Sequence, residues 1–462
     1  MAEPQIIWFR NDLRLADQAA VRAAAAAGPV IAVYVLDDET PGKWRIGAAQ
    51  RWWLHYSLVA LAADLKKMGG ALVLRRGRPA VELAGVAKAA NATAVHALHH
   101  YEPWAVTEEA AVAKVLDLTL HDGAYLAPPG TTKSGSGTPY RIFTPFWNAL
   151  QHAMPPGDPE PAPMIRFAKP PKSDDLDDWK LLAADPDWSG GFDVWTPGEA
   201  GAHAALDTFA DVAADYEHGR NYPAKPLTSR LSPHLHHGEI SPAQVWAAIS
   251  GRGEGPVSYR REIGWRDFAI NVVQQFPRLG DEPNRPQFAD FPFRDDPKGL
   301  RAWQRGRTGY PIVDAGMRQL WTTGWMHNRV RMIVASFLTK HLLIDWRHGE
   351  RWFWDCLVDA DYGNNSLGWQ WIMGSGVDSS PFNRIFTPVG QSEKFDGGGA
   401  YIREWVPELA KLPDDAIHAP WDASPMALKA AGVDLGKTYP HPIVDHAKAR
   451  ARALAAYAET KG

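Results

Sequence analysis

Short hydrophobic runs recur in the first quarter of the chain, separated by polar turn residues. They occupy residues 5–9, 29–37, 71–77, 94–100 and 118–123. Alanine-rich stretches with the spacing of amphipathic helices lie between them, at 16–27, 47–68, 79–90 and 104–116. Strands that alternate with helices are typical of parallel βαβ units. We therefore expect residues 1–127 to form an α/β domain with a doubly wound, Rossmann-like parallel sheet that binds ligands beyond the carboxyl ends of its strands.

A segment rich in Pro, Gly and Ser interrupts this pattern. It contains PPGTTKSGSGTP at 128–139 and PPGDPEPAP at 155–163, with one helical or extended piece at 140–152. Such composition is typical of connecting segments, so we interpret residues 128–200 as an interdomain linker.

Helical patterns follow one another from residue 201 onward. Examples are 204–219, 241–250, 312–324 and 328–343, and no convincing alternating strand separates them. Ser241-Pro242 has the residue types of a helix N-cap followed by proline at the first helical position. The pattern predicts an all-α domain over residues 201–462.

Composition restricts the class of protein. No stretch reaches the roughly 18 apolar residues of a membrane span, and the N-terminal MAEPQ lacks the basic start and apolar core of a signal peptide. We therefore expect a cytoplasmic protein that does not contact a membrane. The single cysteine, Cys356, excludes intrachain disulfides, iron–sulfur clusters and cysteine-based zinc sites.

Several familiar catalytic signatures do not occur in the sequence. The first predicted strand is followed by Arg10-Asn11-Asp12-Leu13-Arg14 instead of G-x-G-x-x-G, which disfavours a nicotinamide dinucleotide site. There is no G-x-S-x-G, H-E-x-x-H or P-loop motif. His234, His236 and His237 lie close together without a cysteine or a second spaced pair, so we interpret them as surface residues or as supports behind a site.

Charge is unevenly distributed along the chain. The whole sequence carries 49 Lys and Arg against 53 Asp and Glu, a net charge of −4, whereas residues 252–351 carry 17 against 11, a net charge of +6. A cationic region in an acidic protein indicates an anionic partner, because Lys and Arg neutralise phosphates. A solvated helical surface is the alternative interpretation.

Tryptophan is abundant, with 21 residues in 462, and nine of them lie between Trp265 and Trp371. Core packing explains many helical aromatics. Here, however, polar and charged residues are interleaved with the tryptophans. This mixture favours a pocket that stacks flat rings and hydrogen-bonds their edges.

Two further motifs allow alternative interpretations. TSRLSP at 228–233 places hydroxyls and an arginine before a predicted helix, which suits phosphate binding, although an ordinary capped helix start has the same composition. The pair Asp359-x-Asp361 is compatible with metal or acid–base chemistry. Because no clustered histidines or further carboxylates accompany it, we expect no metal site.

Several long motifs resemble those of the DNA photolyase/cryptochrome family. They are WFRNDLRLADQAA (8–20), TSRLSP (228–233), REIGWRDF (261–268), the segment 308–376 from TGYPIVDAGM to WQWIMGSG, and RIFTPVGQSEKFD (384–396). The match runs through nearly the whole chain and is most similar to bacterial cyclobutane pyrimidine dimer photolyases of class I or III. The resemblance implies an antenna-binding α/β domain, a long linker and an all-α domain that holds FAD.

The resemblance also implies roles for individual residues. The positions that contact FAD are Tyr216, Thr228, Ser229, Arg230, Leu231, Ser232, Trp265, Arg266, Asn328, Arg331, Asp359, Asp361 and Asn365. The positions that line the substrate cavity are Arg220, Glu262, Trp265, Arg329, Met332, Trp371 and Gln391. Asn365 would face flavin N5, and Trp265 and Trp371 would stack on a flipped-out pyrimidine dimer.

The activity implied by the resemblance is light-driven repair of cyclobutane pyrimidine dimers in UV-damaged DNA, independent of base sequence. Photoexcited FADH⁻ would pass one electron to the dimer, whose inter-ring bonds open before the electron returns. Glu262 would stabilise the dimer radical anion. The positions implied to be catalytic are Glu262, Asn328 and Met332 in the cavity, and Trp346 and Trp369 in the electron chain to the flavin. We expect a monomer.

Two related functions are less compatible with the residues present. Photolyases of the (6-4) photoproduct resemble one another in two histidines four positions apart, and here Asn328 and Met332 cannot act as general acids. A cryptochrome-type blue-light photoreceptor is the alternative function. Asn365, where plant-type cryptochromes carry Asp, and the lack of a long C-terminal signalling tail favour the photolyase.

Two positions depart from the family pattern. Phe293 occupies the place of the usual third tryptophan of the electron chain. Two alternatives follow: either Trp303, Trp352, Trp354 or a tyrosine ends another route, or photoreduction of the flavin is slow. His341 stands where many members carry an acidic partner for the arginine at Arg331. We therefore predict a weaker or different pairing of Arg331.

An antenna chromophore is the last expectation from the resemblance. Trp104 would stack on a pterin and Glu109 would hydrogen-bond its ring, although ordinary aromatic residues of a βα loop are the alternative interpretation. We favour 5,10-methenyltetrahydrofolate over 8-hydroxy-deazaflavin.

Overall fold

A computed structural model describes residues 2–460 of the chain. Its five strands form one parallel sheet in the order β3-β2-β1-β4-β5. The strands are β1 (Gln5–Phe9), β2 (Val30–Leu36), β3 (Leu72–Arg76), β4 (Ala94–Leu98) and β5 (Asp117–His121). The register aligns Ile6 with Ile31 on one side and with Val95 on the other. Because the strand order reverses at β1, the prediction of a doubly wound α/β domain is confirmed.

Helices cover both faces of this sheet. Ile7 and Phe9 of β1 pack in a cluster with residues of α1 (Ala19–Ala27) and α2 (Ala48–Lys67). Ile6 and Trp8 point to the other face and pack against α3 (Pro79–Ala90) and α4 (Pro103–Val112). A central strand buried on both faces needs apolar residues throughout, which explains why the sequence shows continuous hydrophobic runs instead of alternation.

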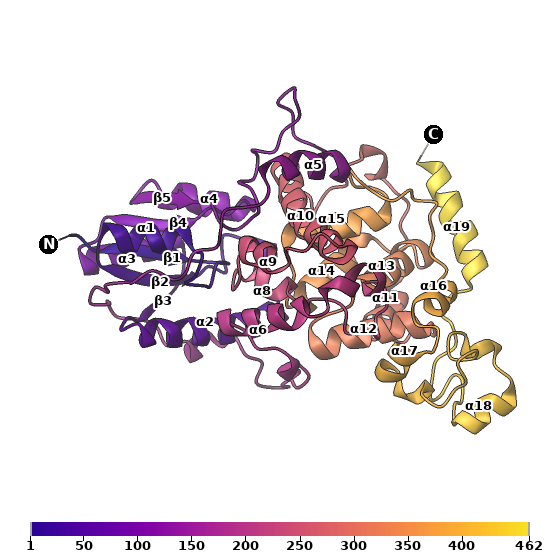
Figure 1. Ribbon diagram of the computed structural model, residues 1–462. Helices are drawn as coiled ribbons and strands as arrows, with labels where there is room; N and C mark the ends of the chain where they lie inside the picture. Colours follow the sequence, from indigo (N-terminus) through magenta and orange to yellow (C-terminus); the bar gives the residue numbers. More distant parts are fainter. Residues whose placement is uncertain (1, 461–462) are drawn as a thin grey trace.

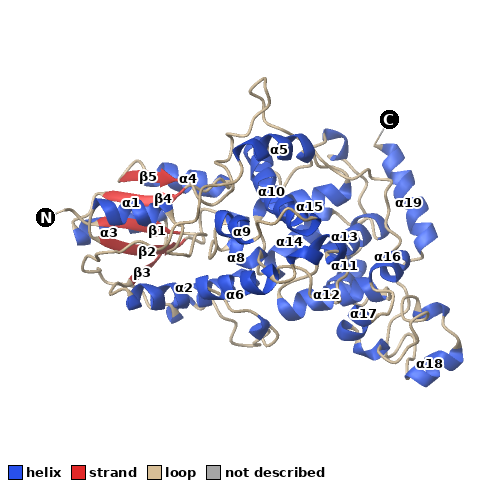
Figure 2. Ribbon diagram, viewed as in Figure 1, coloured by secondary structure: helices blue, strands red, loops and turns tan. Residues whose placement is uncertain are grey.

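The rest of the chain is helical, and the strands lie at one end of the molecule (Figure 2). In the described part after β5 the elements are α5 (Phe143–Leu150), α6 (Glu199–Ala210), α7 (Tyr216–Gly219), α8 (Ser232–His236), α9 (Pro242–Ala248), α10 (Glu254–Gln275), α11 (Pro297–Gln304), α12 (Pro311–Thr323), α13 (Asn328–Ser336), α14 (Trp346–Cys356), α15 (Tyr362–Met373), α16 (Pro388–Phe395), α17 (Ala400–Trp405), α18 (Pro425–Ala431) and α19 (His446–Glu459). Ser241 caps α9 in a capping box with Gln244, as its sequence predicts. Within residues 2–460, no helix has the length and apolar character needed to cross a membrane.

Two helices are shorter than the sequence pattern predicts. Instead of one helix over 204–219, α6 ends at Ala210, and a 3-10 turn over Ala213–Asp215 precedes α7. A Cβ at Gly255 of α10 would lie 2.2 Å from the carbonyl oxygen of Ala213, so this turn sits directly on α10. The helix predicted over 328–343 changes at Ser336 into a π-helical turn over Phe337–His341. The first of these corrections follows from packing between distant segments, which local periodicity does not report.

The π-helical turn buries a lysine. Lys340 is 1% exposed, donates from Nζ to the carbonyl oxygen of Arg384 (3.0 Å), and lies over the ring of Phe382. Burial, together with the charge of Arg384, lowers the pKa of Lys340 to about 7.

This lysine is expected to make stability depend on pH. Between pH 7 and about 10, the unfolded chain holds a proton on Lys340 that the folded chain does not, so the free energy of unfolding rises with pH. One titrating group contributes a slope of at most about 1.4 kcal/mol per pH unit. Urea unfolding of Lys340→Met between pH 7.5 and 9.5 should therefore show a flatter slope than the wild type. Equal slopes would show that Lys340 stays protonated in the folded protein.

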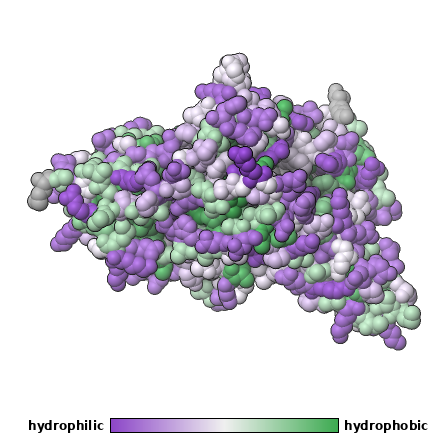
Figure 3. Space-filling view, viewed as in Figure 1, coloured by the Kyte–Doolittle hydropathy of each residue, from purple (hydrophilic) through white to green (hydrophobic). Residues whose placement is uncertain are grey.

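A buried carboxyl group joins the sheet domain to the helical domain. Glu239, which follows α8, accepts hydrogen bonds from Trp53 Nε1 (3.0 Å) and Ser57 Oγ of α2 and contacts His234 Nδ1. The ring of His237 stacks on Trp53 at 5.7 Å and 10°. His234 and His237 are each 3% exposed, so of the two interpretations the surface position is wrong for them, and they fill the contact between the domains. In Figure 3, hydrophobic residues gather in a hollow near the middle of the face, close to α8 and α9 of Figure 1.

Replacing Glu239 with Gln is expected to weaken this contact. An amide nitrogen would replace one of the two oxygens that face Trp53, Ser57 and His234, which leaves a buried polar group unsatisfied. We expect the free energy of unfolding to fall by about 1–3 kcal/mol in urea denaturation. Glu254→Gln, at an exposed position, is the matched control and should be neutral. An unchanged free energy of unfolding in Glu239→Gln would mean that an amide at this position stabilises the fold as well as the carboxyl group does.

Candidate functional site

The centre of the helical domain is strongly cationic. His327 caps α13, accepting the N–H of Arg329 at Nδ1 (3.2 Å). Burial and four nearby arginines lower its pKa to about 3. Those four residues are Arg329, Arg331, Arg230 and Arg220. His327 is therefore neutral at physiological pH, while the arginines suit a ligand that carries phosphates.

Asp359 holds one of these arginines. Both of its carboxylate oxygens accept from Arg331 Nη2, at 3.0 and 2.8 Å, and Oδ2 also accepts from Ser232 Oγ at 2.6 Å. Arg331 donates from Nε to the carbonyl oxygen of Met326 at 2.8 Å. The different pairing predicted for Arg331 is thus an ion pair with Asp359, while His341 lies 2.8 Å from His446.

Asp361, two residues after Asp359, is the N-cap of α15. Its Oδ1 accepts from the backbone N–H of Asn364 at 2.7 Å, and its Oδ2 lies 3.9 Å from His236 Nδ1. Burial raises the pKa of Asp361, but the His236 ring and the Asn364 N–H outweigh it, and the net pKa is lowered. Asn365 donates from Nδ2 to the carbonyl oxygen of Glu350 at 3.1 Å, which leaves its Oδ1 free to accept. Within residues 2–460, no group of three or more His, Cys, Asp or Glu side chains could hold a metal ion.

The segment 228–232 lies against the other side of this centre. Arg230 has a left-handed backbone (φ 52°), and its guanidinium lies over the ring of Trp325 at 5.1 Å. Ser229 Oγ accepts from the backbone N–H of Leu231 (3.2 Å) and from Tyr259 Oη (2.9 Å). Tyr259 in turn packs edge-on against Tyr216. The predicted residues Tyr216, Ser229, Leu231 and Ser232 are thus in one connected group.

A second group of predicted residues forms around Arg220. Its Nη1 lies 2.6 Å from Glu262 Oε1 of α10. Arg329 donates from Nε and Nη2 to Asn221 Oδ1, at 3.2 and 2.6 Å, so Asn221 connects α13 to the end of α7. Arg329 also lies over the ring of Phe395 in α16. The remaining predicted cavity residues are partly exposed side chains on α10, α13, α15 and α16, namely Trp265, Met332, Trp371 and Gln391.

Much of the tryptophan-rich segment is hydrophobic core. Trp303, Trp346 and Trp369 are at most 2% exposed, which corrects the expectation that these tryptophans line a pocket. Trp369 contacts Trp303 (6.2 Å) and Phe353 (5.0 Å), and Trp346 belongs to the same hydrophobic core. Phe293 is partly exposed and contacts Phe291 at 4.8 Å.

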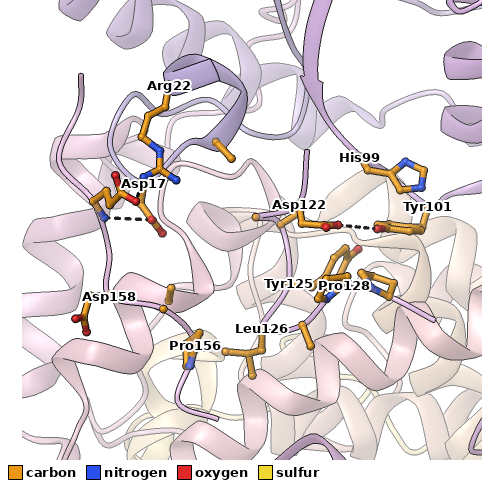
Figure 4. Close-up of a pocket in the computed structure, with 18 residues that line it drawn as sticks. Asp17, Arg22, His99, Tyr101, Asp122, Tyr125, Leu126, Pro128, Pro156 and Asp158 are labelled. Atoms are coloured by element: carbon orange, nitrogen blue, oxygen red, sulfur yellow. Dashed lines mark hydrogen bonds and ion pairs between the residues drawn. The ribbon is translucent and has the colours of Figure 1, made fainter. Parts of the chain in front are cut away.

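The sheet domain carries a cavity of about 280 Å³ beyond the carboxyl ends of β4 and β5 (Figure 4). Tyr101 donates from Oη to Asp122 Oδ1 in its wall (3.3 Å). Trp104 is not part of this wall and contacts Tyr362 of α15 at 5.2 Å. Glu109 is buried, with its oxygens 2.8 Å from Arg10 Nη2 and 2.7 Å from His99 Nδ1. Its carboxylate therefore already has protein partners.

Comparison with known proteins connects these features. The family model "DNA photolyase" matches residues 5–164, and "FAD binding domain of DNA photolyase" matches residues 259–459. A deoxyribodipyrimidine photo-lyase from Agrobacterium fabrum is 52% identical, over 99% of this chain and 98% of that protein. The chain belongs to the DNA photolyase family. The crystal structure of a bacterial class III photolyase from Agrobacterium tumefaciens matches with a TM-score of 0.96 and 51% identity, over 100% of this chain and 98% of that one.

Proteins named cryptochromes also match this chain. Cryptochrome-1 from Arabidopsis thaliana is 38% identical, over 96% of this chain and 69% of that protein. A cryptochrome structure from Synechocystis matches with a TM-score of 0.89 and 29% identity, over 98% of this chain and 99% of that one.

The helical half of this photolyase-family chain has groups that fit FAD. Arg266 donates from Nη2 to the carbonyl oxygen of Leu235 (3.1 Å), while its Nη1 is buried with no hydrogen-bond partner in the described residues. Arg266 and Asp361 line the same small void between the two domains. A donor without a partner next to a carboxylate suits a polar ring edge.

The sequence analysis missed several residues of the site. Asn221 accepts from Arg329, His327 caps α13, and Phe143 stacks on Trp265. His327 stands directly before a predicted helix, so its capping role could have been anticipated. The other two act through contacts between segments that are far apart in the chain.

Proposed function

We propose that this chain is a deoxyribodipyrimidine photo-lyase, which uses light to repair cyclobutane pyrimidine dimers in DNA by electron transfer from reduced FAD. The observation that carries the proposal is the 52% identity to a protein of that name over essentially the whole of both chains. Glu262, which forms an ion pair with Arg220, lies on the same helix as Trp265. A polar group and a stacking surface are thus close together, which supports the proposal.

The bound FAD, in its reduced form, supplies the light-excited electron. The chain binds, orients and shields the reactants. Arg220, Arg329 and the other cations of the centre would hold phosphates. Trp265 and Trp371 would stack on the extruded bases, since stacking is independent of sequence. Glu262, held by Arg220, would face the pyrimidine carbonyl edge, where negative charge develops.

The antenna, the monomeric state and the cytoplasmic location remain predictions from the sequence. For the antenna, we propose 5,10-methenyltetrahydrofolate near Trp104, with 8-hydroxy-deazaflavin as the alternative. The ring of Trp104 is partly exposed and contacts the ring of Tyr362, which supports a stacking role for Trp104. Since Glu109 is engaged by Arg10 and His99, its contact with a ligand would require an exchange of partners. The absorption spectrum of the purified protein distinguishes folate from deazaflavin.

The function is tested with an oligonucleotide that contains one thymine dimer. Protein with reduced flavin should restore the two thymines under blue light and leave the dimer intact in the dark. If the flavin photoreduces normally but no dimer is repaired, the protein is a cryptochrome-type photoreceptor instead.

A further inference from the structure

The indole of Trp265 is packed against a ring from the linker. The ring of Phe143, in α5, lies parallel to it, with the centroids 3.7 Å apart and an interplanar angle of 8°. Phe268 meets the edge of the indole at 83°. Phe143 can cover only one face of the indole, and the Trp265 side chain stays partly exposed.

Helix α5 is fixed firmly to the helix that carries Trp265. A Cβ at Gly264 of α10 would lie 2.5 Å from two ring atoms of Trp147, so only glycine lets α5 approach this closely. The carbonyl oxygen of Tyr140, just before α5, accepts from Asn271 Nδ2 and Gln275 Nε2 of α10, both at 2.9 Å. The position of Phe143 relative to α10 is therefore set from both ends of α5.

The same residue is tied to the segment that follows Trp371. The backbone N–H of Phe143, the first of α5, donates to Asp378 Oδ2 at 2.8 Å. Asp378 follows α15, the helix of Trp371, and Ser380 N–H donates back to the carbonyl oxygen of Trp371 at 3.1 Å. Phe143 thus contacts both Trp265 and the segment that follows the helix of Trp371.

We propose that Phe143 and Asp378 are positioning residues that fix the plane of Trp265 and its place relative to Trp371, so that the two indoles meet an extruded pyrimidine dimer. This inference rests on the proposed function. Stacking depends on the alignment of the rings, and an indole held in advance loses less conformational freedom on binding. The linker segment with α5 is, on this account, part of the substrate site.

The test compares binding and turnover of the flavin-loaded variants Phe143→Leu and Asp378→Ala. Both should raise Kd and KM for dimer-containing DNA by about 2–10-fold, the value of one aromatic pair. Maximal repair at saturating DNA, affinity for undamaged DNA and flavin content should change little. The conservative variants Phe143→Tyr and Asp378→Asn should restore dimer affinity. Phe146→Leu, one turn along α5 and packed on Phe268 instead of Trp265, is the matched control for a loss of stability alone.

Three results would overturn the proposal. They are unchanged dimer affinity in both variants, an equal loss for damaged and undamaged DNA, or the same loss in Phe146→Leu. If the Leu variant does not fold, Asp378→Ala decides alone, because Asp378 is partly exposed. Failure of the wild type to repair dimers would instead contradict the proposed function.

Discussion

Replacing Asp359 with Ala is expected to abolish flavin retention. Asp359 is 8% exposed and accepts two hydrogen bonds from Arg331 and one from Ser232, so it joins α13 and α8 around the cationic centre. Its removal leaves the Arg331 guanidinium without its counter-charge. Breaking a buried ion pair in this way costs about 3–5 kcal/mol. If this free energy is lost from the conformation that binds flavin, the affinity for flavin drops by roughly 100- to 5,000-fold.

The flavin-to-protein absorbance ratio after gel filtration measures this effect. Asp355→Ala is the matched control, since Asp355 is exposed, lies four residues before Asp359 near the end of α14 and bonds to the backbone of Ala48. The control should keep its flavin. Full flavin content in Asp359→Ala would show that the Arg331 pair does not shape the cofactor site.

Replacing Trp265 with Ala is expected to remove most of the preference for damaged DNA. Stacking of a base on an aromatic side chain contributes about 1–3 kcal/mol, which corresponds to a roughly 5- to 150-fold rise in Kd. Trp265 has one face on Phe143 and is partly exposed, so it can accept a base. The affinity for undamaged duplex DNA, which is bound through its phosphates, should change little.

Dark binding of a dimer-containing oligonucleotide, measured against its undamaged twin, gives the size of this effect. Trp321→Ala is the control, because Trp321 is 54% exposed and stacks on Trp352. The control should keep the damaged-to-undamaged affinity ratio of the wild type. An unchanged ratio in Trp265→Ala would exclude Trp265 as a stacking surface for the dimer.

Local sequence signals predicted the sheet well and the helix ends less well. Strands β1 and β2 are buried along their whole length, so each forms an unmistakable apolar run such as Gln5–Phe9, whereas the edge strand β5 is mostly exposed. The turn between α6 and α7 lies so close to α10 that a Cβ at Gly255 would clash with it, and the chain changes to a π-helical turn at Phe337–His341. Helical periodicity continues through both places, so the sequence alone predicts longer helices.

The site was predictable where motifs are compact and not where it depends on distant contacts. Arg331, Asp359 and Asp361 belong to one continuous motif, and the structure does bring Arg331 and Asp359 together. The contacts of Phe143 with Trp265 and with Asp378 join residues more than 100 positions apart. The buried histidines were missed for a related reason: His234 and His237 look polar in the sequence, but they fill the contact between the domains.

The wavelength dependence of repair shows whether the bound flavin drives the reaction. The rate at which one thymine dimer is restored in an oligonucleotide should follow the absorption spectrum of the reduced flavin bound to this protein, and should be zero in the dark. Repair in the dark, or no repair at any wavelength by protein whose flavin is bound and fully reduced, would contradict the account.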